Sequence, residues 1–371
     1  MRMVVVPAAL LGGGFFYFWL VVAWGDRSTA GLKYYGRTPP QRRRYRRLLS
    51  FQRVLLAPLV WFLPRVLPFR FASASFHFRG VAAPQGTCSP HSFARAASFQ
   101  PSPADVFVAT PMRCGTTWMQ QLLYEVLTRG QQDLAALGRT LCEVSPWLES
   151  LRGVPIEVAP RVGRDPPRRI IKTHLPARLC PYALAASQIY VVRHPVSCFA
   201  SCVSFLRMNL QGFAPRLEDA EAWFCSPQSM WWGTWPEHVR GWWERGRDND
   251  NVEFVFFEDI KRDLPGTIRR LAQVLAIPPL TPLELAQVLD HGSYAWMQTH
   301  ADLFEVQPPH LLQPHPTCFV SGRMNRYEDV PADMGQRILD WCHAELADID
   351  FPWERFGDGD SLRLGPTGDV R

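Results

Sequence analysis

The chain has 371 residues, of which 47% are hydrophobic and 20% are charged. This length and composition allow one α/β domain of ordinary size plus an additional segment, and they exclude a chain that is disordered throughout. The formal net charge of +6 is modest. Its basic surplus is local, between residues 27 and 53, so no nucleic-acid partner is predicted. Nine cysteines without paired CxxC spacing provide neither a zinc motif nor a disulfide framework.

The first apolar segment covers residues 3–25, which contain no charged side chain. A segment of this length can span the roughly 30 Å hydrocarbon core of a bilayer. A cleaved signal peptide is the alternative, but residues 22–25 contain Trp24 and offer a poor cleavage site. We therefore predict a retained, single-pass membrane anchor.

An arginine cluster follows this segment, whereas only Arg2 precedes it. By the positive-inside rule, the rest of the protein then faces the cytoplasm, and the cluster is expected to meet an anionic membrane surface. A second apolar stretch, residues 54–67, is interrupted by Pro58, Pro64 and Arg65. Two interpretations stay open for it: a segment lying at the membrane interface, or a buried helix packed on the catalytic domain.

A possible anion-binding loop lies near the middle of the first half. Residues 105–109 form a short apolar run that predicts a buried strand, and an amphipathic helix is expected from about residue 119. Between them lies a loop, residues 110–118, in the strand–loop–helix order that holds a phosphate or sulfate. A purely structural turn is the alternative. A kinase-type loop is not predicted, because Gly115 is followed by Thr116 instead of lysine and Arg113 is the only cation.

A further apolar strand is predicted at residues 188–192, followed by Arg193 and then a helix. A charge at the carboxyl end of a buried strand lies where α/β folds bind ligands. Arginine is suited to a phosphate because its guanidinium binds two oxygens at once. A capping or salt-bridging role for Arg193 is the alternative.

The loop sequence Arg-Cys-Gly-Thr-Thr-Trp at residues 113–118 resembles the 5′-phosphosulfate loop of the sulfotransferases that use 3′-phosphoadenosine-5′-phosphosulfate (PAPS), in particular the cytosolic type. That family usually carries Lys-Ser-Gly-Thr-Thr-Trp there. The resemblance implies that Arg113 contacts the sulfuryl group and Trp118 the adenine. It also implies that Thr116 and Thr117 hold the 5′-phosphate, and it places Cys114 and Gly115 among the nucleotide-binding residues.

Other segments are similar to the same family in order and spacing. The segment at residues 168–176 resembles the one that supplies the catalytic base, which implies His174 as general base and Lys172 as the group that stabilises the leaving oxygen. The 3′-phosphate is then expected on Arg193 and Ser201. For the adenine, the resemblance implies Phe257, where a tyrosine is usual, and Tyr294.

The match weakens at the last nucleotide-binding loop. The family has Arg-Lys-Gly there, whereas this chain has Val320, Ser321 and Gly322. Arg323 or Arg326 is the candidate to reach the 3′-phosphate in place of the missing basic pair. The resemblance covers about residues 70–356.

We therefore predict an α/β fold with a mostly parallel sheet flanked by helices, in a single catalytic domain at residues 70–356. Residues 1–69 are predicted to form the anchor and the basic segment, and residues 357–371 a flexible tail. The predicted activity is sulfuryl transfer from PAPS to a hydroxyl or amine of a small-molecule or lipid-like acceptor, without a metal. The alternatives are an inactive, membrane-tethered nucleotide-binding protein and a P-loop kinase or NTPase. The sequence predicts neither the acceptor nor the oligomeric state.

Overall fold

The computed structural model describes residues 12–13, 32–55, 57–66, 75–151, 153–164, 166–306, 308–310, 313, 315, 319 and 326–357. Within this part of the chain, a four-stranded sheet has the order β4-β3-β5-β6, and all neighbouring strands pair in parallel. Its strands are β3 (Asp105–Ala109), β4 (Arg169–Thr173), β5 (Ser187–Val192) and β6 (Val252–Phe256). The predicted α/β fold with a parallel sheet flanked by helices is confirmed.

The central strand β3 is buried along its whole length. Its alternate residues belong to two different apolar cores: Val106 and Val108 face one, Phe107 and Ala109 face the other. A parallel strand covered on both faces must be apolar on both faces, which is why this segment is an unbroken hydrophobic run. The register aligns Ala109 with Thr173 of β4. Thr110, His174 and Arg193, which follow the three strands, are therefore brought to one edge of the sheet.

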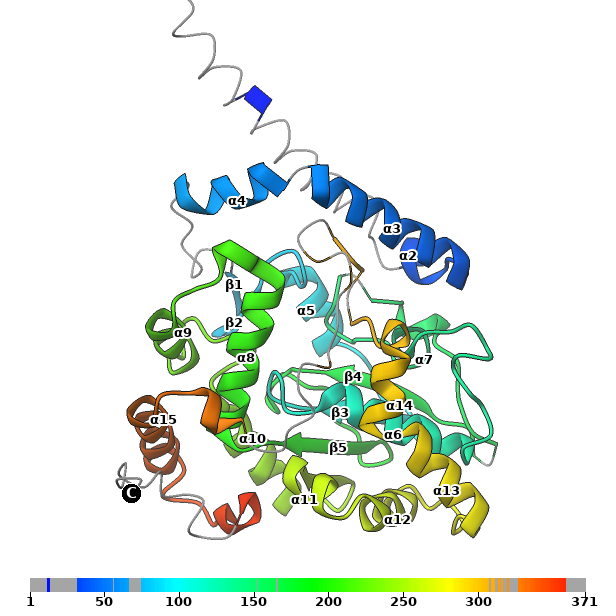
Figure 1. Ribbon diagram of the computed structural model, residues 1–371. Helices are drawn as coiled ribbons and strands as arrows, with labels where there is room; N and C mark the ends of the chain where they lie inside the picture. Colours follow the sequence, from blue (N-terminus) through cyan, green and yellow to red (C-terminus); the bar gives the residue numbers. More distant parts are fainter. Residues whose placement is uncertain are drawn as a thin grey trace, which may run out of the picture.

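Helices cover both faces of the sheet (Figure 1). The first core is covered by α6 (Thr116–Thr128), α12 (Leu264–Val274) and α13 (Pro282–His291). The second core is covered by α8 (Pro195–Leu210), α10 (Trp235–Arg247) and α15 (Ala332–Glu345). Shorter helices connect these elements: α5 (Pro90–Ala97), α7 (Leu141–Val144), α9 (Leu217–Phe224), α11 (Phe257–Arg262) and α14 (Tyr294–Thr299).

The remaining elements lie at the margins of the domain. An antiparallel hairpin pairs β1 (Ser75–Phe78) with β2 (Val81–Pro84). Short 3₁₀ turns complete the connections: η2 (Ile156–Val158), η3 (Gln211–Phe213), η4 (Ala301–Leu303), η5 (Tyr327–Asp329) and η6 (Trp353–Phe356).

The N-terminal helices α2 (Leu32–Tyr35), α3 (Pro39–Leu55) and α4 (Ala57–Val66) lie along one end of the molecule (Figure 1). Two arginines of the basic cluster point inward from α3. Arg46 pairs with Glu305 at 2.9 Å, and Arg42 donates to the backbone oxygen of Gly138 at 3.0 Å. The expectation that this cluster meets a membrane surface is therefore wrong for these two side chains, because they are buried against the domain.

The predicted membrane location must also be corrected. Among the described residues, no helix is long and apolar enough to cross a bilayer. Neither of the two helices that follow the predicted anchor meets this requirement. Helix α3 is rich in arginine, and helix α4 has only ten residues, with Pro64 inside it. Apart from Gly12 and Gly13, the apolar segment at residues 3–25 lies outside the described residues.

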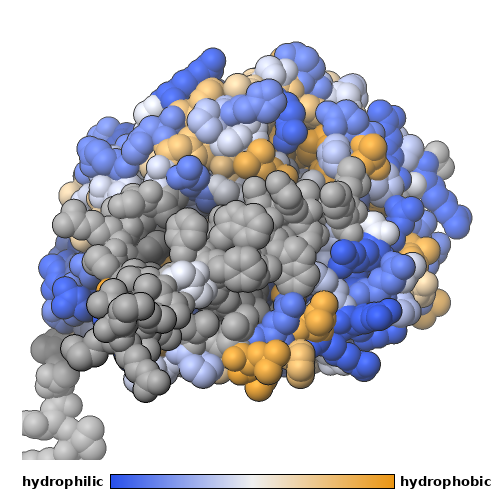
Figure 2. Space-filling view, turned by 90° about the horizontal axis from the view of Figure 1, so that it is seen from above, coloured by the Kyte–Doolittle hydropathy of each residue, from blue (hydrophilic) through white to orange (hydrophobic). Residues whose placement is uncertain are grey.

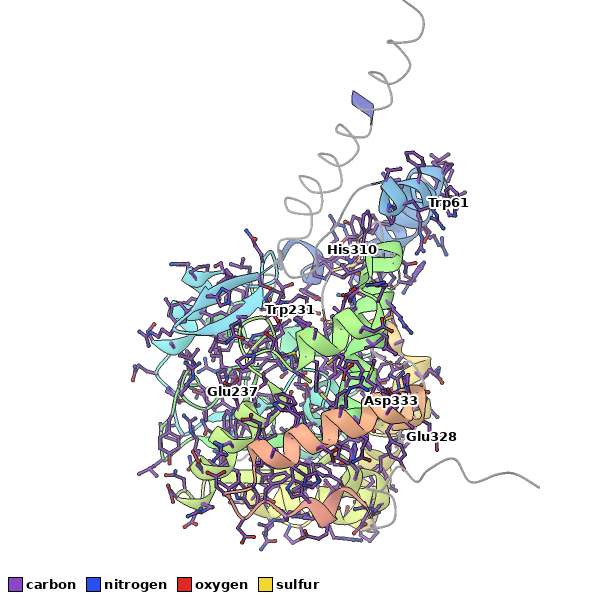
Figure 3. All side chains as sticks on the ribbon, turned by 90° about the vertical axis from the view of Figure 1, so that its left-hand side faces the viewer. Trp61, Trp231, Glu237, His310, Glu328 and Asp333 are labelled. Carbon is purple, nitrogen blue, oxygen red and sulfur yellow. The ribbon has the colours of Figure 1, made fainter. Side chains whose placement is uncertain are left out.

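Helix α4 does not match the alternative of a buried helix either. Its Trp61 is 61% exposed and its Phe62 is 51% exposed. Trp61 lies on the outer side of the molecule, away from the sheet (Figure 3). Seen from this end, hydrophobic and hydrophilic residues lie side by side on the surface (Figure 2). These two side chains are therefore not packed into the domain.

Candidate active site

The loop after β3 has the backbone that an anion site requires. Gly115 adopts φ +99° and directly precedes α6, so the N-terminus of a 13-residue helix opens at the sheet edge. A Cβ added to Gly115 would lie 2.7 Å from the Phe257 ring, so only glycine fits this close approach. Thr116 and Thr117 are the first two residues of α6. Their backbone N–H groups belong to the helix end that attracts negative charge.

His174 lies directly beside this loop and is buried. Its Nδ1 atom is 3.0 Å from the backbone oxygen of Thr110. A carbonyl oxygen can only accept a hydrogen bond, so Nδ1 carries the proton and Nε2 keeps its lone pair. Burial, reinforced by the nearby positive charge of Lys172, lowers the pKa of His174 well below its usual value, which keeps the ring neutral.

The same network reaches the start of α6. The Thr110 hydroxyl lies 3.2 Å from Nδ1 of His174 and 2.6 Å from the Thr116 hydroxyl. All three groups are buried. The imidazole and the helix N-terminus are thus held in one hydrogen-bonded unit, which fixes the ring relative to the loop.

Two side chains hold the peptide groups of His174 from behind. Glu149 accepts from the His174 N–H at 2.7 Å and from the Thr173 hydroxyl at 2.9 Å. On the other side, Nε2 of His238 lies 3.0 Å from the His174 carbonyl and must donate to it. Tyr190 completes the chain by donating to Nδ1 of His238 at 3.0 Å. Both flanks of the histidine are therefore fixed by buried groups.

Two tryptophans enclose the His174 ring. The ring centroids of Trp147 and His174 are 5.3 Å apart in an edge-to-face arrangement, and Trp232 lies 5.1 Å from the same ring. Lys172 places its Nζ atom 3.8 Å from the centroid of Trp147. Such a cation–π contact holds the ammonium group near the imidazole.

Arg193 comes from the end of β5 and is buried. Its guanidinium carbon lies 4.4 Å from the centroid of the Phe257 ring. Burial lowers the pKa of Arg193, although Glu258 nearby opposes that change. Burial also raises the pKa of Glu258 to about 7, because its charged form is poorly solvated. Burial therefore opposes the charge of both side chains at the end of β5.

Ser201, on α8, accepts a hydrogen bond from Nε of Arg113 at 3.3 Å. The guanidinium of Arg113 also lies 5.1 Å from the Phe205 ring, one turn further along the same helix. The structure therefore brings together Arg113, which the sequence assigned to the sulfuryl group, and Ser201, which it assigned to the 3′-phosphate.

The predicted adenine residues gather around Lys261. The Lys261 ammonium lies 5.2 Å from the centroid of Trp118 and 5.7 Å from that of Tyr294. Phe257 meets Trp118 edge to face, with 5.5 Å between ring centroids. Lys261 was not among the predicted site residues, because nothing in its spacing indicates that it faces these rings.

The last nucleotide loop is described only in part. Gly322 and Arg323, together with Val320 and Ser321, lie outside the described residues. Arg326 is described and packs on α8, where its backbone N–H donates to the Ser197 hydroxyl at 3.1 Å and its Nη2 donates to Ser204 at 2.7 Å.

The predicted site residues did not include Glu149, Trp147, Trp232 or His238. Each lies far along the chain from the residue that it supports, and only Trp232 carries a local sign of constraint, at φ +65°. No group of three or more His, Cys, Asp or Glu side chains in the described ranges could hold a metal ion.

Known sequences resemble this chain over its central part. A family model described as "Sulfotransferase domain" matches residues 103–309, which is more than half of the chain. A protein of Oryctolagus cuniculus named Sulfotransferase 1C2 is 33% identical over 189 residues, 48% of this chain and 60% of the relative. A Homo sapiens protein named Sulfotransferase 2B1 is 26% identical over 245 residues, 64% of each chain. The matched region thus spans about three fifths of the length of these curated relatives.

Solved structures share the architecture. Retinol dehydratase in complex with androsterone and inactive cofactor PAP aligns with a TM-score of 0.59 and 20% identity, over 76% of this chain and 92% of that one. Mouse sulfotransferase SULT7A1 complexed with PAP aligns with a TM-score of 0.56 and 20% identity, over 74% and 96%. At this identity the likeness shows the fold. Because the family model covers more than half of the sequence and includes the loop, His174 and Arg193, the chain belongs to the sulfotransferase domain family.

Proposed function

We propose that this protein transfers a sulfuryl group from PAPS to the hydroxyl (or amine) of a small-molecule acceptor, with His174 as the general base. The catalytic domain would cover residues 70–356. The proposal depends above all on one observation. The His174 imidazole lies beside a helix N-terminus, and its Nδ1 atom contacts the carbonyl oxygen of Thr110, which fixes the proton on Nδ1. Nε2 of His174 is then the atom that can accept a proton from the acceptor.

The chemistry requires little more than positioning and charge stabilisation. As the acceptor oxygen bonds to sulfur, its proton passes to Nε2 of His174, and the bond between sulfur and the bridging phosphate oxygen breaks. Negative charge then grows on the departing phosphate. The Lys172 ammonium, the Arg113 guanidinium and the N–H groups of residues 114–117 would stabilise that charge.

The donor would be held by three sets of groups. The 5′ side would rest on Cys114, Gly115, Thr116 and Thr117, where the glycine leaves room that a side chain would fill. The 3′-phosphate would lie on Arg193 and Ser201. The resemblance adds Gly322 and Arg323, which lie outside the described residues. The adenine would lie among Trp118, Phe257 and Tyr294. Two fold neighbours are described as complexes with PAP, which supports this assignment.

The aromatic residues around His174 favour an acceptor that is a flat, apolar molecule with a hydroxyl group. Trp147 and Trp232 enclose His174, and aromatic walls of this kind favour ring systems through stacking and burial. One fold neighbour is described in complex with androsterone and another with retinol. Both ligands are largely apolar alcohols, in agreement with the class proposed here.

Calorimetric titration with 3′-phosphoadenosine-5′-phosphate (PAP) tests the donor site. We expect metal-independent binding to the wild-type protein, weaker by about 10- to 100-fold in Arg193→Ala, because a charge-assisted phosphate contact contributes about 1.5–3 kcal/mol. Arg207→Ala is the matched control, since Arg207 is exposed on the same helix as Ser201.

Two outcomes would contradict the proposal. Preference for ATP with magnesium would favour a kinase or NTPase, and PAP binding without turnover across a panel of phenols and steroid alcohols would favour an inactive nucleotide-binding protein. Neither alternative is supported by a specific contact in the described residues.

A further inference from the structure

Three cysteine thiols converge beneath the loop at residues 110–118, and the proposed reaction uses none of them. The Sγ atoms of Cys114 and Cys198 are 3.6 Å apart. Cys198 and Cys202 lie one helical turn apart on α8, and both thiols point at the backbone oxygen of Met112, at 3.1 Å and 3.8 Å. All three cysteines are buried and free.

The position of these thiols is more informative than their burial. A buried free cysteine is usually a small packing residue. Here, however, Cys114 belongs to the loop proposed to hold the 5′ side of the donor, and Cys202 follows Ser201, the proposed contact of the 3′-phosphate. Contact between Cys114 and Cys198 joins the anion loop to the helix that carries Ser201. A covalent bond at this point would link the two halves of the donor site.

The electrostatic surroundings favour one ionised sulfur in the cluster. Burial opposes ionisation of Cys198, but hydrogen bonds from the Cys114 and Cys202 thiols, with Arg193 and Arg113 nearby, lower the pKa of Cys198 well below its usual value. Burial instead raises the pKa values of Cys114 and Cys202. A thiolate beside a thiol is the arrangement from which a disulfide forms.

We propose that Cys114 and Cys198 form an oxidisable pair whose disulfide switches off nucleotide binding. The oxidant is a peroxide. The Cys198 thiolate attacks one peroxide oxygen, giving a sulfenic acid and, after protonation, one water. The Cys114 sulfur then attacks the sulfenic sulfur, the S–S bond forms, and a second water leaves. Two thiols and one hydrogen peroxide thus give one disulfide and two waters, and a dithiol reverses the change.

The consequence for binding follows from the loop backbone, and it rests on the proposed function. A disulfide holds its sulfurs about 2.05 Å apart, so the two sulfurs must approach from their present separation of 3.6 Å. Cys114 lies between Arg113 at φ +70° and Gly115 at φ +99°. Movement of Cys114 therefore turns the neighbouring N–H groups away from the position that an anion needs. A bound nucleotide would hold the loop in place and slow the reaction.

The test uses the full chain, free of nucleotide, exposed to hydrogen peroxide and then desalted. Mass spectrometry of a non-reduced digest measures the peptide that joins Cys114 to Cys198, and calorimetry measures PAP binding. We expect the cross-linked peptide, at least 10-fold weaker binding that dithiothreitol restores, and less cross-linking when PAP is present during oxidation. Cys198→Ser and Cys198→Ala are expected to bind PAP equally before and after peroxide. Cys225→Ser, outside the cluster, should behave like the wild type.

Three results would overturn the inference. They are the absence of the cross-linked peptide, a cross-link that leaves PAP affinity unchanged, and equal loss of binding in the Cys198 variants. Failure of the reduced wild type to bind PAP would instead contradict the proposed function. That failure is distinguishable, because the cross-linked peptide is measured without any nucleotide.

Discussion

Two arginines are buried in different parts of the molecule and are held in contrasting ways. Arg46, on α3, pairs with Glu305 at 2.9 Å and lies 3.2 Å from the Tyr34 hydroxyl. Arg193, at the sheet edge, lies over the Phe257 ring. Although burial opposes the charge of Arg46, Glu305 and Tyr34 outweigh it and raise the pKa of Arg46. At Arg193 burial prevails and the pKa is lowered.

This contrast separates an arginine whose charge the neighbouring protein groups stabilise from one whose charge burial opposes. In the N-terminal region, the guanidinium of Arg46 pairs with the carboxylate of Glu305 and contacts the Tyr34 hydroxyl, so its charge stabilises the fold. At the sheet edge, burial opposes the charge of the Arg193 guanidinium, and the negative charge of a bound phosphate would offset this unfavourable desolvation. Strongly perturbed ionisable groups are concentrated at functional sites for this reason. Substitutions at the sheet edge should therefore affect function, and those near Arg46 should affect stability.

The largest effect is expected at His174. His174→Ala should lower kcat by about 10²- to 10⁴-fold, because it removes the proposed general base. PAP affinity should change little, since the proposed role of the imidazole is towards the acceptor and not the nucleotide. Turnover would be measured with labelled PAPS and an acceptor from the panel of phenols and steroid alcohols. His91→Ala, an exposed histidine of α5, is the control. Full activity in His174→Ala would show that another group takes the proton.

The next effect concerns the fold. Arg46→Met should destabilise the protein by about 3–5 kcal/mol, because Glu305 is left as a buried charge without its cation. The control Arg43→Met, on the exposed face of the same helix, should stay within about 0.5 kcal/mol of the wild type. Chemical denaturation measures both.

A double variant makes this prediction sharper. Arg46→Met combined with Glu305→Gln removes both charges and should recover part of the lost stability, since an apolar or neutral replacement of a whole ion pair is often tolerated. If Arg46→Met were as stable as Arg43→Met, the contact between α3 and Glu305 would contribute nothing, and the contrast between the two arginines would fail.

The sheet and the main loop could be predicted from the sequence because their signals are local. An apolar run such as residues 105–109 predicts a buried strand. The presence of Thr116 instead of lysine directly after Gly115 argues against a kinase-type loop. The supports of His174 could not be predicted in this way. Glu149 and His238 reach it from segments separated by 25 and 64 residues, and only the fold brings them together.

The wrong expectation for the basic cluster has a different origin. The sequence contained the signal that Arg42 and Arg46 face the domain, but the cluster was interpreted only by its charge. The inward positions of α3 are Arg42, Tyr45, Arg46 and Leu49. These four positions are spaced so that they share one face of the helix. Such a spacing predicts that this face contacts a protein surface, just as a stripe of hydrophobic residues does. Counting arginines alone suggested a membrane, whereas their phase along the helix separates the buried pair from the exposed Arg43 and Arg44.

The smallest effect is a pH dependence at the sheet edge. Burial raises the pKa of Glu258 to about 7 in the folded protein, whereas an unfolded chain has about 4.5. Below pH 4.5 the carboxyl is protonated in both states, so the stability associated with this group is complete. As the pH rises towards 7, the unfolded chain releases the proton and the folded chain keeps it, and up to about 3 kcal/mol of stability is lost. Above pH 7 no further loss is expected from Glu258.

Glu258→Gln removes this dependence, because the amide keeps the acceptor for the His194 N–H, which Glu258 holds at 3.1 Å, without a charge. The difference in unfolding free energy between variant and wild type, measured by denaturation from pH 4 to pH 8, should therefore grow with pH and level off near 7. Other buried carboxyls contribute equally to both proteins and cancel. A difference that stays constant across this range would mean that Arg193 keeps Glu258 ionised. Neighbouring charges would then outweigh burial at the sheet edge as they do at Arg46, and the contrast between the two sites would disappear.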